Sequence, residues 1–409
     1  MTDVLSRSDF IRPRYGAGCF ADLPQTIRRV LSGEGKPGLV EGRYSKVVLF
    51  FVDAFGWRFF APRRQRYSFL RHFDERGSAL KITAQFPSTT SAHVTCIQTG
   101  LPPVQSGIFE WQYYEPEADQ IIKPLLFAPL DSQDRGSLEL EPGKILPHEN
   151  LYRDLAAAGV RSYVFQPAEH FNSPYNEWTF RGANTRPYRT LPSALKSLQL
   201  LLDEVEGPAY FFLYFDGIDK VGHSYGPDSP QVDAELDAFL TIADRLFLES
   251  AAGRHEDTLL LVSADHGMTA VDPQTTMYLD RAAEFAGCER FLRRNQKGEL
   301  LVPAGSARDM FLYIEEGLLE EAHDFFAQRL AGRAEVRRVA EMVEEGYFGP
   351  GPASAAFLAR VGDLVILPYA HETLWWWSGG DGRQHFYGNH GGLTRDEMET
   401  PLLACGLGA

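Results

Sequence analysis

Leu259-Leu260-Leu261-Val262-Ser263-Ala264-Asp265-His266-Gly267 is an apolar and small stretch that ends in a carboxylate and an imidazole. A continuous apolar run of this length is typical of a parallel strand that is covered on both faces. In open α/β sheets, ligands bind beyond the carboxyl ends of such strands. The stretch therefore predicts a buried strand over 258–264 that delivers Asp265 and His266 to a functional edge of the sheet.

Three other segments repeat this arrangement. The run VVLFFVD ends in Asp53, YFFLYFDGIDKVGH carries Asp219 and His223, and GNHGG carries His390. Asp219 and His223 are four residues apart, so their side chains converge if the chain turns into a helix after the strand. Carboxylates combined with imidazoles suit zinc, with manganese or iron as alternatives, whereas magnesium and calcium prefer oxygen alone. Any single histidine is more often structural, but the joint set predicts a metal site.

Helical and strand patterns alternate along the chain. A strand over 46–53 is followed by a helical stretch over 57–76 and a strand near 80–84. The alternation then repeats as helix and strand over 151–158 and 160–165, 192–206 and 210–215, and 231–250 and 258–264. This order predicts an α/β fold with a doubly wound, mostly parallel sheet and helices on both faces.

The pattern changes outside this core. Residues 1–44 read as an N-terminal extension with a short amphipathic segment at 23–31. A strand and an amphipathic helix over 309–330 and a further strand over 361–368 lie within 275–385, which we interpret as a smaller accessory region inserted into the main domain of 45–409. Residues 103–150 form a second long connection that is rich in aromatic residues and prolines.

Composition and charge restrict the function classes. Hydrophobic residues make up 44% of the chain and charged residues 23%, as in ordinary globular proteins. The net charge of -15 argues against polymeric nucleic acid or an anionic membrane as the main partner, because both require basic surfaces. The four cysteines show no CxxC spacing, so neither a disulfide framework nor a cysteine zinc site is indicated.

The N-terminal stretch MTDVLSRSDFIRPRYG lacks the apolar core of a signal peptide. No apolar run approaches the roughly 20 residues of a membrane span. We therefore expect a soluble, cytoplasmic protein.

The segment FPSTTSAHVT supplies candidate nucleophiles. Its hydroxyl-rich turn opens a predicted helix, where free backbone amides and the helix dipole favour an anion. Thr89, Thr90 and Ser91 are the candidates, and ordinary helix capping by these residues is the alternative. The combination with the aspartate and histidine set favours catalysis.

The order of motifs resembles the nucleotide pyrophosphatase/phosphodiesterase family of the alkaline phosphatase superfamily. The segments that carry the resemblance are Asp53 after its strand, Pro87–Thr90 with Thr99-Gly100-Leu101, Asp219–His223 with Tyr225-Gly226-Pro227, Asp265–Met268, and His390-Gly391. The resemblance spans about residues 45 to 405 and implies that 45–409 is an alkaline phosphatase-like catalytic domain. No Cys-x-Pro-x-Arg signature is present, which argues against a sulfatase.

The resemblance implies two zinc ions. Asp219, His223 and His390 would hold one ion, and Asp53, Asp265, His266 and the Thr90 oxygen would hold the other. Thr90 would attack phosphorus to give a covalent phospho-threonine, which water would then hydrolyse. Two dications and four anionic ligands give a nearly neutral site, so we expect singly charged diesters or nucleotide pyrophosphate bonds to be preferred. Monoesters would need an added cation, for which Arg181, Arg186 and Arg189 are candidates.

The expected partner is a small phosphorylated, nucleotide-like molecule. Where the family typically has asparagine three residues after the nucleophile, this chain has His93, which we expect to donate a hydrogen bond to the substrate. Trp111, Tyr113 and Tyr114 are candidates for the wall of the leaving-group pocket, with simple packing of the long loop as the alternative.

Other functions stay open from the sequence. A phosphomonoesterase or phosphonate hydrolase would use the same set of residues. A non-catalytic protein that keeps the fold to bind a metal or ligand is the alternative from another class. The presence of the full predicted ligand set and of Thr90 favours an enzyme.

Overall fold

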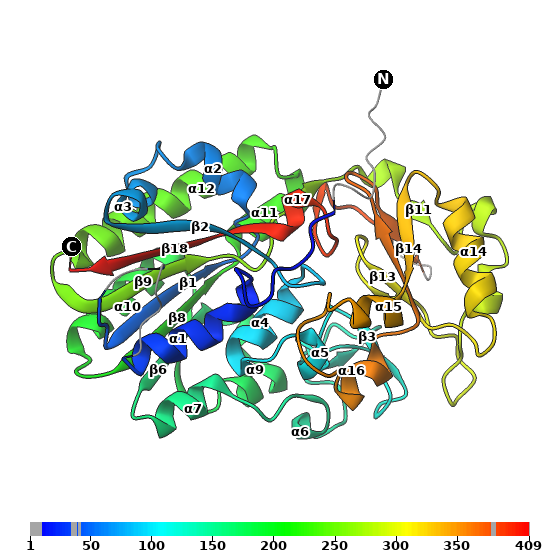
Figure 1. The fold of residues 1–409 in the computed structure, drawn as a ribbon, viewed down its shortest axis with the longest axis horizontal. Helices are drawn as coiled ribbons and strands as arrows, with labels where there is room; N and C mark the ends of the chain where they lie inside the picture. The colour runs from blue at the N-terminus through cyan, green and yellow to red at the C-terminus, as the bar shows by residue number, and fades with distance from the viewer. Residues whose placement is uncertain (1–9, 34–38, 40–41, 378–381, 409) are drawn as a thin grey trace.

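A seven-stranded sheet runs through the larger part of the computed structural model, which describes residues 10–33, 39, 42–377 and 382–408 (Figure 1). Its strands, in spatial order, are β2 (Gly77–Thr83), β18 (Glu399–Leu407), β9 (His255–Ser263), β1 (Lys46–Val52), β8 (Ala209–Phe215), β6 (Arg161–Pro167) and β7 (Ala183–Tyr188). β1 pairs in parallel with β8 and β9, and β6 pairs in parallel with β7 and β8. β18 runs antiparallel to both of its neighbours. The predicted α/β fold with a mostly parallel sheet is confirmed.

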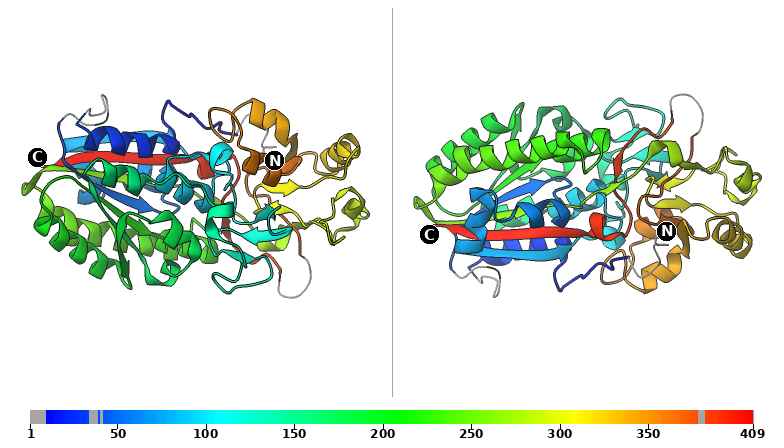
Figure 2. Two further views of the ribbon diagram at one scale, coloured as in Figure 1. Left: turned by 90° about the horizontal axis from the view of Figure 1, so that it is seen from below. Right: turned by 90° about the horizontal axis from the view of Figure 1, so that it is seen from above.

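Helices cover both faces of this sheet, as the two views of Figure 2 show. Successive side chains of β1 point to opposite faces, so Val48 and Phe50 enter one core while Val47 and Leu49 enter the other. The first core is covered by α2 (Trp57–Arg63), α3 (Ser68–Arg76), α10 (Leu191–Glu204) and α12 (Pro230–Ala243). The second is covered by α1 (Leu23–Leu31), α4 (Thr90–Thr99) and α7 (Leu151–Ala157). Burial on both faces explains why the central strands are apolar throughout.

A smaller part lies at the end of the molecule opposite the C-terminus (Figure 1). Its four-stranded antiparallel sheet has the order β12 (Ala304–Gly305), β13 (Met310–Leu312), β15 (Leu364–Pro368) and β14 (Ala334–Arg338). The helices of this part are α14 (Leu319–Arg329), α15 (Val339–Glu344) and α16 (Ala355–Arg360). The 103–150 connection adds a sheet of β3 (Tyr113–Glu115), β4 (Gln120–Lys123) and β5 (Ala128–Pro129).

The long connection and the inserted residues share one hydrophobic core. Phe109 and Tyr113 belong to the same buried cluster as Phe311 and Val365. The domain limits drawn from the sequence stay a prediction, and the structure adds that 103–150 packs with the accessory residues.

Shorter elements connect these layers. They are α5 (Pro103–Ser106), α6 (Pro142–Ile145), α8 (Ala168–Phe171), α9 (Pro174–Thr179), α11 (Gly217–Tyr225), α13 (Glu249–Ala251), α17 (Arg395–Met398), β10 (Thr269–Ala270), β11 (Met277–Tyr278), β16 (Leu374–Trp375) and β17 (Gly388–Asn389). None of the described helices combines the length and the apolar composition of a membrane-spanning segment. All four cysteines are buried and free.

Two local expectations differ from the structure. The helical stretch predicted over 57–76 is split into α2 and α3, and Pro62, which lacks a backbone N–H, lies in the last turn of α2. Part of the predicted N-terminal extension belongs to the main core, because α1 buries Leu23, Ile27 and Val30 against the sheet.

Candidate active site and metal centre

The register of the central strands brings the predicted metal ligands to one edge. Val52 of β1 pairs with Phe215 of β8, and Phe51 pairs with Ser263 of β9, so the three strands end together. Asp53 follows β1 directly, and Asp265 follows β9 after one further residue. Asp219 lies in the first turn of α11, the helix that follows β8, and His223 lies one turn later. This is the carboxyl edge at which open α/β sheets bind ligands.

Each of the three predicted histidine ligands has one ring nitrogen fixed by the backbone. Nδ1 of His223 lies 2.8 Å from the Gly388 carbonyl oxygen, and Nδ1 of His390 lies 3.0 Å from that of Ser88. Nδ1 of His266 lies 2.9 Å from the carbonyl oxygen of Gly267. A ring that donates its Nδ1 proton to a carbonyl keeps Nε2 free as an acceptor, which is the usual arrangement of a metal-binding histidine.

The three Nε2 atoms face carboxylate oxygens. His223 Nε2 lies 3.4 Å and His390 Nε2 3.6 Å from Asp219 Oδ1. His266 Nε2 lies 3.4 Å from both Asp53 Oδ1 and Asp265 Oδ2. The rings of His266 and His390 stack with centroids 3.6 Å apart, which joins the two halves of the site.

The carboxylates have buried oxygens that a cation would satisfy. Oδ1 of Asp53, Oδ1 of Asp219 and Oδ2 of Asp265 are buried and have no hydrogen-bond partner within the described residues. Burial raises the pKa of Asp53 and of Asp219, and it raises the pKa of Asp265 to about 7. Burial and the neighbouring histidines lower the pKa of His266 and His390. Buried carboxylates beside neutral imidazoles fit a site for divalent metal ions.

Among the described residues, three groups of donor atoms are close enough to hold a metal ion; two lie in the predicted ligand set, and the third is Glu169, His170 and Asp216. Of the two in the predicted set, one group is Asp53, Asp265 and His266, and the other is Asp219, His266 and His390. The first matches the set that the resemblance implies. The second contains His266 where the resemblance implies His223, because the stacked ring of His266 lies between the two groups.

Thr90 lies beside the first group. It is the first residue of α4, and its Oγ1 is 3.2 Å from His266 Nε2 and 3.5 Å from Asp53 Oδ2. Thr89 stands at the cap position of the helix, yet its side chain makes no capping hydrogen bond. The geometry therefore distinguishes Thr90 as the hydroxyl that faces the ligand set.

Two glycines of the motifs permit close contacts behind the site. A Cβ on Gly222 of DKVGH would lie 2.5 Å from the sulfur of Met268, and one on Gly388 would lie 2.4 Å from the same atom. Met268 of DHGM thus packs between the His223 helix and the strand that leads to His390. The motifs are adjacent in space because these glycines have no side chain.

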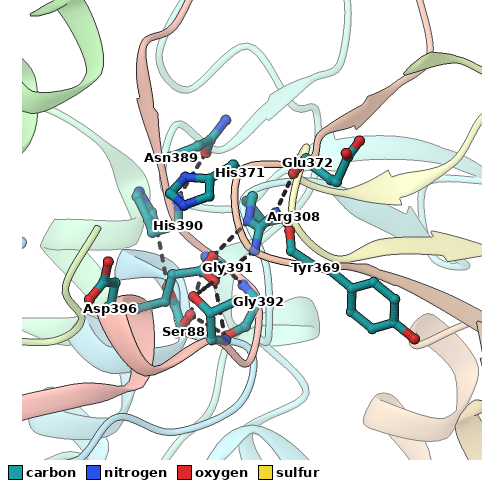
Figure 3. A network of polar contacts seen from close by, with 12 residues as sticks. Ser88, Arg308, Tyr369, His371, Glu372, Asn389, His390, Gly391, Gly392 and Asp396 are labelled. Carbon is teal, nitrogen blue, oxygen red and sulfur yellow. Dashed lines mark hydrogen bonds and ion pairs between the residues drawn. The ribbon is translucent and has the colours of Figure 1, made fainter. Parts of the chain in front are cut away.

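A network of polar contacts supports the turn that carries His390 (Figure 3). Ser88 Oγ donates to the Gly392 carbonyl at 2.7 Å and accepts from the Gly391 N–H at 3.1 Å. Behind the turn, the fully buried Arg308 pairs with Glu397 through two contacts of 2.9 and 3.0 Å. Glu397 Oε1 in turn accepts the Gly392 N–H at 3.0 Å. The Thr90 loop and the His390 turn are therefore fixed to each other.

A cavity of about 430 Å³ opens onto this site. Asp53, Thr90, Asp219, His223 and His390 line it. Its walls add Trp111, which is 43% exposed, together with the aromatic side chains of Trp375 and Phe386. Trp111 therefore lines the cavity, and its role in the wall of the leaving-group pocket stays a prediction.

His93 does not lie in the cavity wall, so its expected role as a substrate donor is wrong. The ring is fully buried, with Nδ1 2.7 Å from the Thr89 carbonyl oxygen and Nε2 accepting the Gln85 N–H at 2.8 Å. Burial lowers the pKa of His93 to about 3, so the ring is neutral. His93 braces the loop that precedes Thr90.

Tyr113 and Tyr114 are also absent from the cavity lining. Tyr113 is fully buried and stacks on Phe109 at 5.2 Å. Tyr114 packs edge-on against Tyr313, and its hydroxyl donates to Asp119 at 2.8 Å. Both belong to β3; Tyr113 is part of the core that the long connection shares with the accessory residues, and the half-buried Tyr114 packs against that core. The alternative of simple packing is correct for these two residues.

The arginines proposed as extra cations do not line the cavity either. Arg181 lies over the Trp178 ring at 3.4 Å. The lining instead includes Arg135 and Lys220, of which Lys220 lies 2.7 Å from Asp216. Arg135 contacts Nδ1 of His170 at 3.3 Å. Arg135 lies in no motif, and Lys220 lies inside the Asp219–His223 motif without being one of its predicted ligands, so the sequence did not single out either residue.

Tyr214 is another site residue that the sequence did not indicate. It lies in β8, is buried, and donates its hydroxyl hydrogen bond to Asp53 Oδ2. An aromatic residue inside an apolar strand reads as core, and only the pairing of β1 with β8 brings it to Asp53.

Comparison with known proteins agrees with this geometry. The model of the family described as type I phosphodiesterase / nucleotide pyrophosphatase matches residues 47–393. The chain belongs to this family. The site residues from Asp53 to His390 all fall within the matched range.

Individual relatives are more distant. The chain is 23% identical over 258 residues to the catalytic subunit of GPI ethanolamine phosphate transferase 3 of Mus musculus, covering 58% of this chain and 21% of that protein. It is 27% identical over 205 residues to the venom phosphodiesterase CdcPDE of Crotalus durissus collilineatus, covering 48% and 23%. The matched part thus spans less than a quarter of these relatives.

Solved structures show the same fold. Murine ectonucleotide pyrophosphatase / phosphodiesterase 5 has a TM-score of 0.60 with 18% identity, covering 88% of this chain and 87% of that one. The same protein has been solved as an inactive variant in complex with AMP, again with a TM-score of 0.60, 18% identity, and 88% and 87% coverage.

Proposed function

We propose that this protein hydrolyses phosphodiester or nucleotide pyrophosphate bonds through a covalent phospho-threonine formed on Thr90. The observation that carries the proposal is the position of Thr90, the first residue of α4. Its Oγ1 lies 3.2 Å from His266 Nε2 and 3.5 Å from Asp53 Oδ2. Family membership and the fold of the solved relatives support phosphodiester hydrolysis.

The proposed ligand sets are those drawn from the sequence. Asp219, His223 and His390 would hold one zinc ion, and Asp53, Asp265, His266 and Thr90 the other. Bound divalent ions supply positive charge that lowers the pKa of a nucleophile and stabilises the oxygens of the phosphoryl group.

The proposed reaction has two displacement steps at phosphorus. Thr90 Oγ attacks phosphorus, the bond from phosphorus to the leaving oxygen breaks, and a phospho-threonine forms. Water attacks the same phosphorus in the second step, which breaks the bond from phosphorus to Thr90 Oγ, releases a phosphate monoester such as a nucleoside monophosphate, and restores the Thr90 hydroxyl. Ser88 and His93 hold the loop that carries Thr90, so the nucleophile is fixed before substrate arrives.

The cavity supports a nucleotide-like substrate with an aromatic group. Trp111, Trp375 and Phe386 offer flat apolar surface beside the ligand set. The AMP complex of the murine relative is consistent with such a ligand. The cytoplasmic location inferred from the sequence stays a prediction.

The test compares four substrates on purified, zinc-loaded protein: bis-p-nitrophenyl phosphate, p-nitrophenyl phosphate, a phenyl phosphonate ester and a nucleotide. We expect the diester to be hydrolysed faster than the monoester. Thr90→Ala should lower kcat by at least about 10³-fold, because the reaction loses its nucleophile. Metal analysis should still find about two zinc ions per chain in wild type, as a two-metal site requires.

Thr89→Val is the matched control, because it removes the neighbouring hydroxyl, whose Oγ1 has no partner in the described part of the chain. A loss equal to that of Thr90→Ala would contradict the assignment of the nucleophile. Faster hydrolysis of the monoester or of the phosphonate would identify the protein as a phosphomonoesterase or a phosphonate hydrolase instead. Binding of these substrates without turnover would favour the non-catalytic alternative.

A transferase is a second candidate, because several relatives are ethanolamine phosphate transferases. An alcohol can attack a phospho-threonine in place of water. Product analysis of a diester reaction with added ethanolamine or glycerol decides between them: hydrolysis leaves a phosphate monoester, whereas transfer leaves a new phosphodiester that carries the added alcohol.

A further inference from the structure

A cluster of charged side chains lines the cavity outside the predicted ligand set. Its members are Arg135, His170, Asp216 and Lys220, which line the same cavity as Thr90. Asp216 follows β8 directly and precedes α11, the helix that carries Asp219. The proposed reaction uses none of these four side chains.

The contacts of His170 fix the position of its ring proton. Nη2 of Arg135 lies 3.3 Å from His170 Nδ1, and because a guanidinium can only donate, Nδ1 accepts. The neutral ring therefore has its proton on Nε2, which lies 2.6 Å from Asp216 Oδ2 and donates to it. His170 thus holds Arg135 through one ring nitrogen and Asp216 through the other.

The same contacts argue against a metal ion at Glu169, His170 and Asp216. Both ring nitrogens of His170 are engaged, so the ring has no free lone pair for a metal. Lys220 Nζ lies 2.7 Å from Asp216 Oδ2 and also pairs with Glu169. The ammonium group of Lys220 therefore already supplies the cation that these two carboxylates need.

Arg135 is not paired with a carboxylate in the described part of the chain. The charge of Glu169 acts on Arg135, but the Glu169 carboxylate is bound by Lys220. Among the described residues, His170 is the one acceptor that the guanidinium contacts. A guanidinium has five N–H donors in a fork that matches a phosphate or a carboxylate. Most of these donors are therefore available to a ligand in the cavity.

The chain around Arg135 is held in place. The Gly136 N–H donates to the Leu126 carbonyl at 2.9 Å, and Leu126 is a buried residue of the cavity wall. The side-chain amide of Asn176 donates to the His170 carbonyl oxygen, which fixes the residue that holds Arg135. A cation that is positioned before the ligand arrives binds it at a smaller cost in conformational entropy.

We propose that Arg135 is a specificity-determining residue that binds a second anionic group of the substrate. This group is a phosphate or a carboxylate outside the phosphodiester or pyrophosphate bond that is cleaved. Because the net charge of the chain is -15, an acidic substrate needs a local cation in order to bind. The inference rests on the proposed function and narrows its substrates to those with an additional acidic group.

The test uses p-nitrophenyl alkyl phosphodiesters whose chains of two to six carbons end in a methyl group, a carboxylate or a phosphate. All of them share the scissile bond and the leaving group. We expect Arg135→Gln to lower kcat/KM for the charged chains by at least about 10-fold more than for uncharged chains of the same length, because a charge-assisted hydrogen bond is lost. A response of the phosphate series alone, or of the carboxylate series alone, would identify the group that Arg135 binds. Equal ratios of charged to uncharged substrate in wild type and Arg135→Gln at every chain length would overturn the proposal.

Arg181→Gln is the matched control. Arg181 lies over the Trp178 ring and is not part of the cavity lining, so its replacement should leave the ratio of charged to uncharged substrate as in wild type. An equal fall of this ratio in both variants would show a general effect of net charge and would overturn the assignment of Arg135.

Two further results would overturn the proposal. The monoester p-nitrophenyl phosphate has no second anionic group, so Arg135→Gln should lower its kcat/KM by less than that of the charged diesters. An equal fall would place Arg135 at the phosphoryl group that is cleaved. A third zinc ion per chain that is lost in His170→Phe would place a metal ion in the cluster.

Binding is measured separately from turnover. Titration calorimetry of zinc-loaded Thr90→Ala uses alkyl phosphates with the same three chain ends. Adding Arg135→Gln should lower the affinity for charged chains by at least about 10-fold more than for uncharged chains. A protein that shows this loss of affinity but hydrolyses no diester would reject the proposed function and keep the anion site. A protein that hydrolyses the diesters with equal ratios would keep the proposed function and reject the anion site.

Discussion

At the scale of the residue, Tyr214 illustrates how a core side chain acquires a role in the site. Its hydroxyl is buried and donates to Asp53 Oδ2; burial raises the pKa of Asp53, and this hydrogen bond opposes the rise because it stabilises the carboxylate. Tyr214→Phe should weaken zinc binding by about 10-fold to 100-fold, as is usual for partners of metal ligands. Competition with a chromogenic chelator measures this.

Tyr210→Phe is the control on the same strand. The Tyr210 hydroxyl is buried and has no hydrogen-bond partner within the described residues, so its removal should leave zinc affinity unchanged. An equal loss of zinc affinity in Tyr214→Phe and Tyr210→Phe would show that loss of either hydroxyl disturbs β8, and it would contradict a specific role for the bond from Tyr214 to Asp53.

His93 gives a prediction in the acid range. Its pKa falls to about 3 in the folded protein from an ordinary 6.5, so the folded state resists protonation and the unfolded state does not. Stability from this residue is complete above pH 6.5 and declines as the pH falls toward 3, at up to about 1.4 kcal/mol per pH unit. Denaturant unfolding of wild type and His93→Gln at pH 7 and pH 5 should show the larger acid loss in wild type.

At the scale of the element, the turn after β9 depends on a glycine. A Cβ on Gly267 would lie 2.0 Å from the Asp396 carbonyl oxygen, and the Gly267 N–H donates to the Glu397 carbonyl at 2.7 Å. Gly267→Ala should separate the Asp265-His266 turn from α17 and destabilise the protein by about 3 kcal/mol or more. Thermal unfolding is the measurement.

Gly207→Ala is the control for Gly267→Ala, because it introduces backbone strain without a steric clash. Gly207 has a φ of +74° and open space around it, so alanine there should cost only about 1 to 2 kcal/mol. A comparable loss at both positions would argue against close packing of the turn and α17.

At the scale of the whole molecule, metal removal should reveal how much the site contributes to stability. Asp53 and Asp265 are buried and Asp219 is half-buried close to them, and the pKa values of all three are raised in the folded protein without a bound cation. Raised carboxyl pKa values mean that the metal-free protein loses stability as the pH rises toward about 7. The Tm difference between zinc-loaded and chelator-treated protein should therefore be larger at pH 7.5 than at pH 5. A difference that is constant with pH would contradict the charge argument.

The sequence by itself determined the parts that depend on local pattern. Continuous apolar runs predicted strands buried on both faces, and Asp53, Asp265 and the Asp219–His223 helix could be placed because parallel strands end at one edge. These placements need only the periods of strands and helices. The hydroxyl turn that opens a helix indicated Thr89, Thr90 and Ser91 as candidates, and the family resemblance singled out Thr90 among them.

The tertiary structure decided what depends on contacts between distant segments. His93, Tyr113 and Tyr114 carry polar groups that the sequence could not distinguish from substrate contacts, but His93 and Tyr113 are fully buried and the half-buried Tyr114 packs against Tyr313. Tyr214 reaches Asp53 only because β1 pairs with β8. A residue's type is local, but the direction of its side chain is fixed by the layers that pack against it.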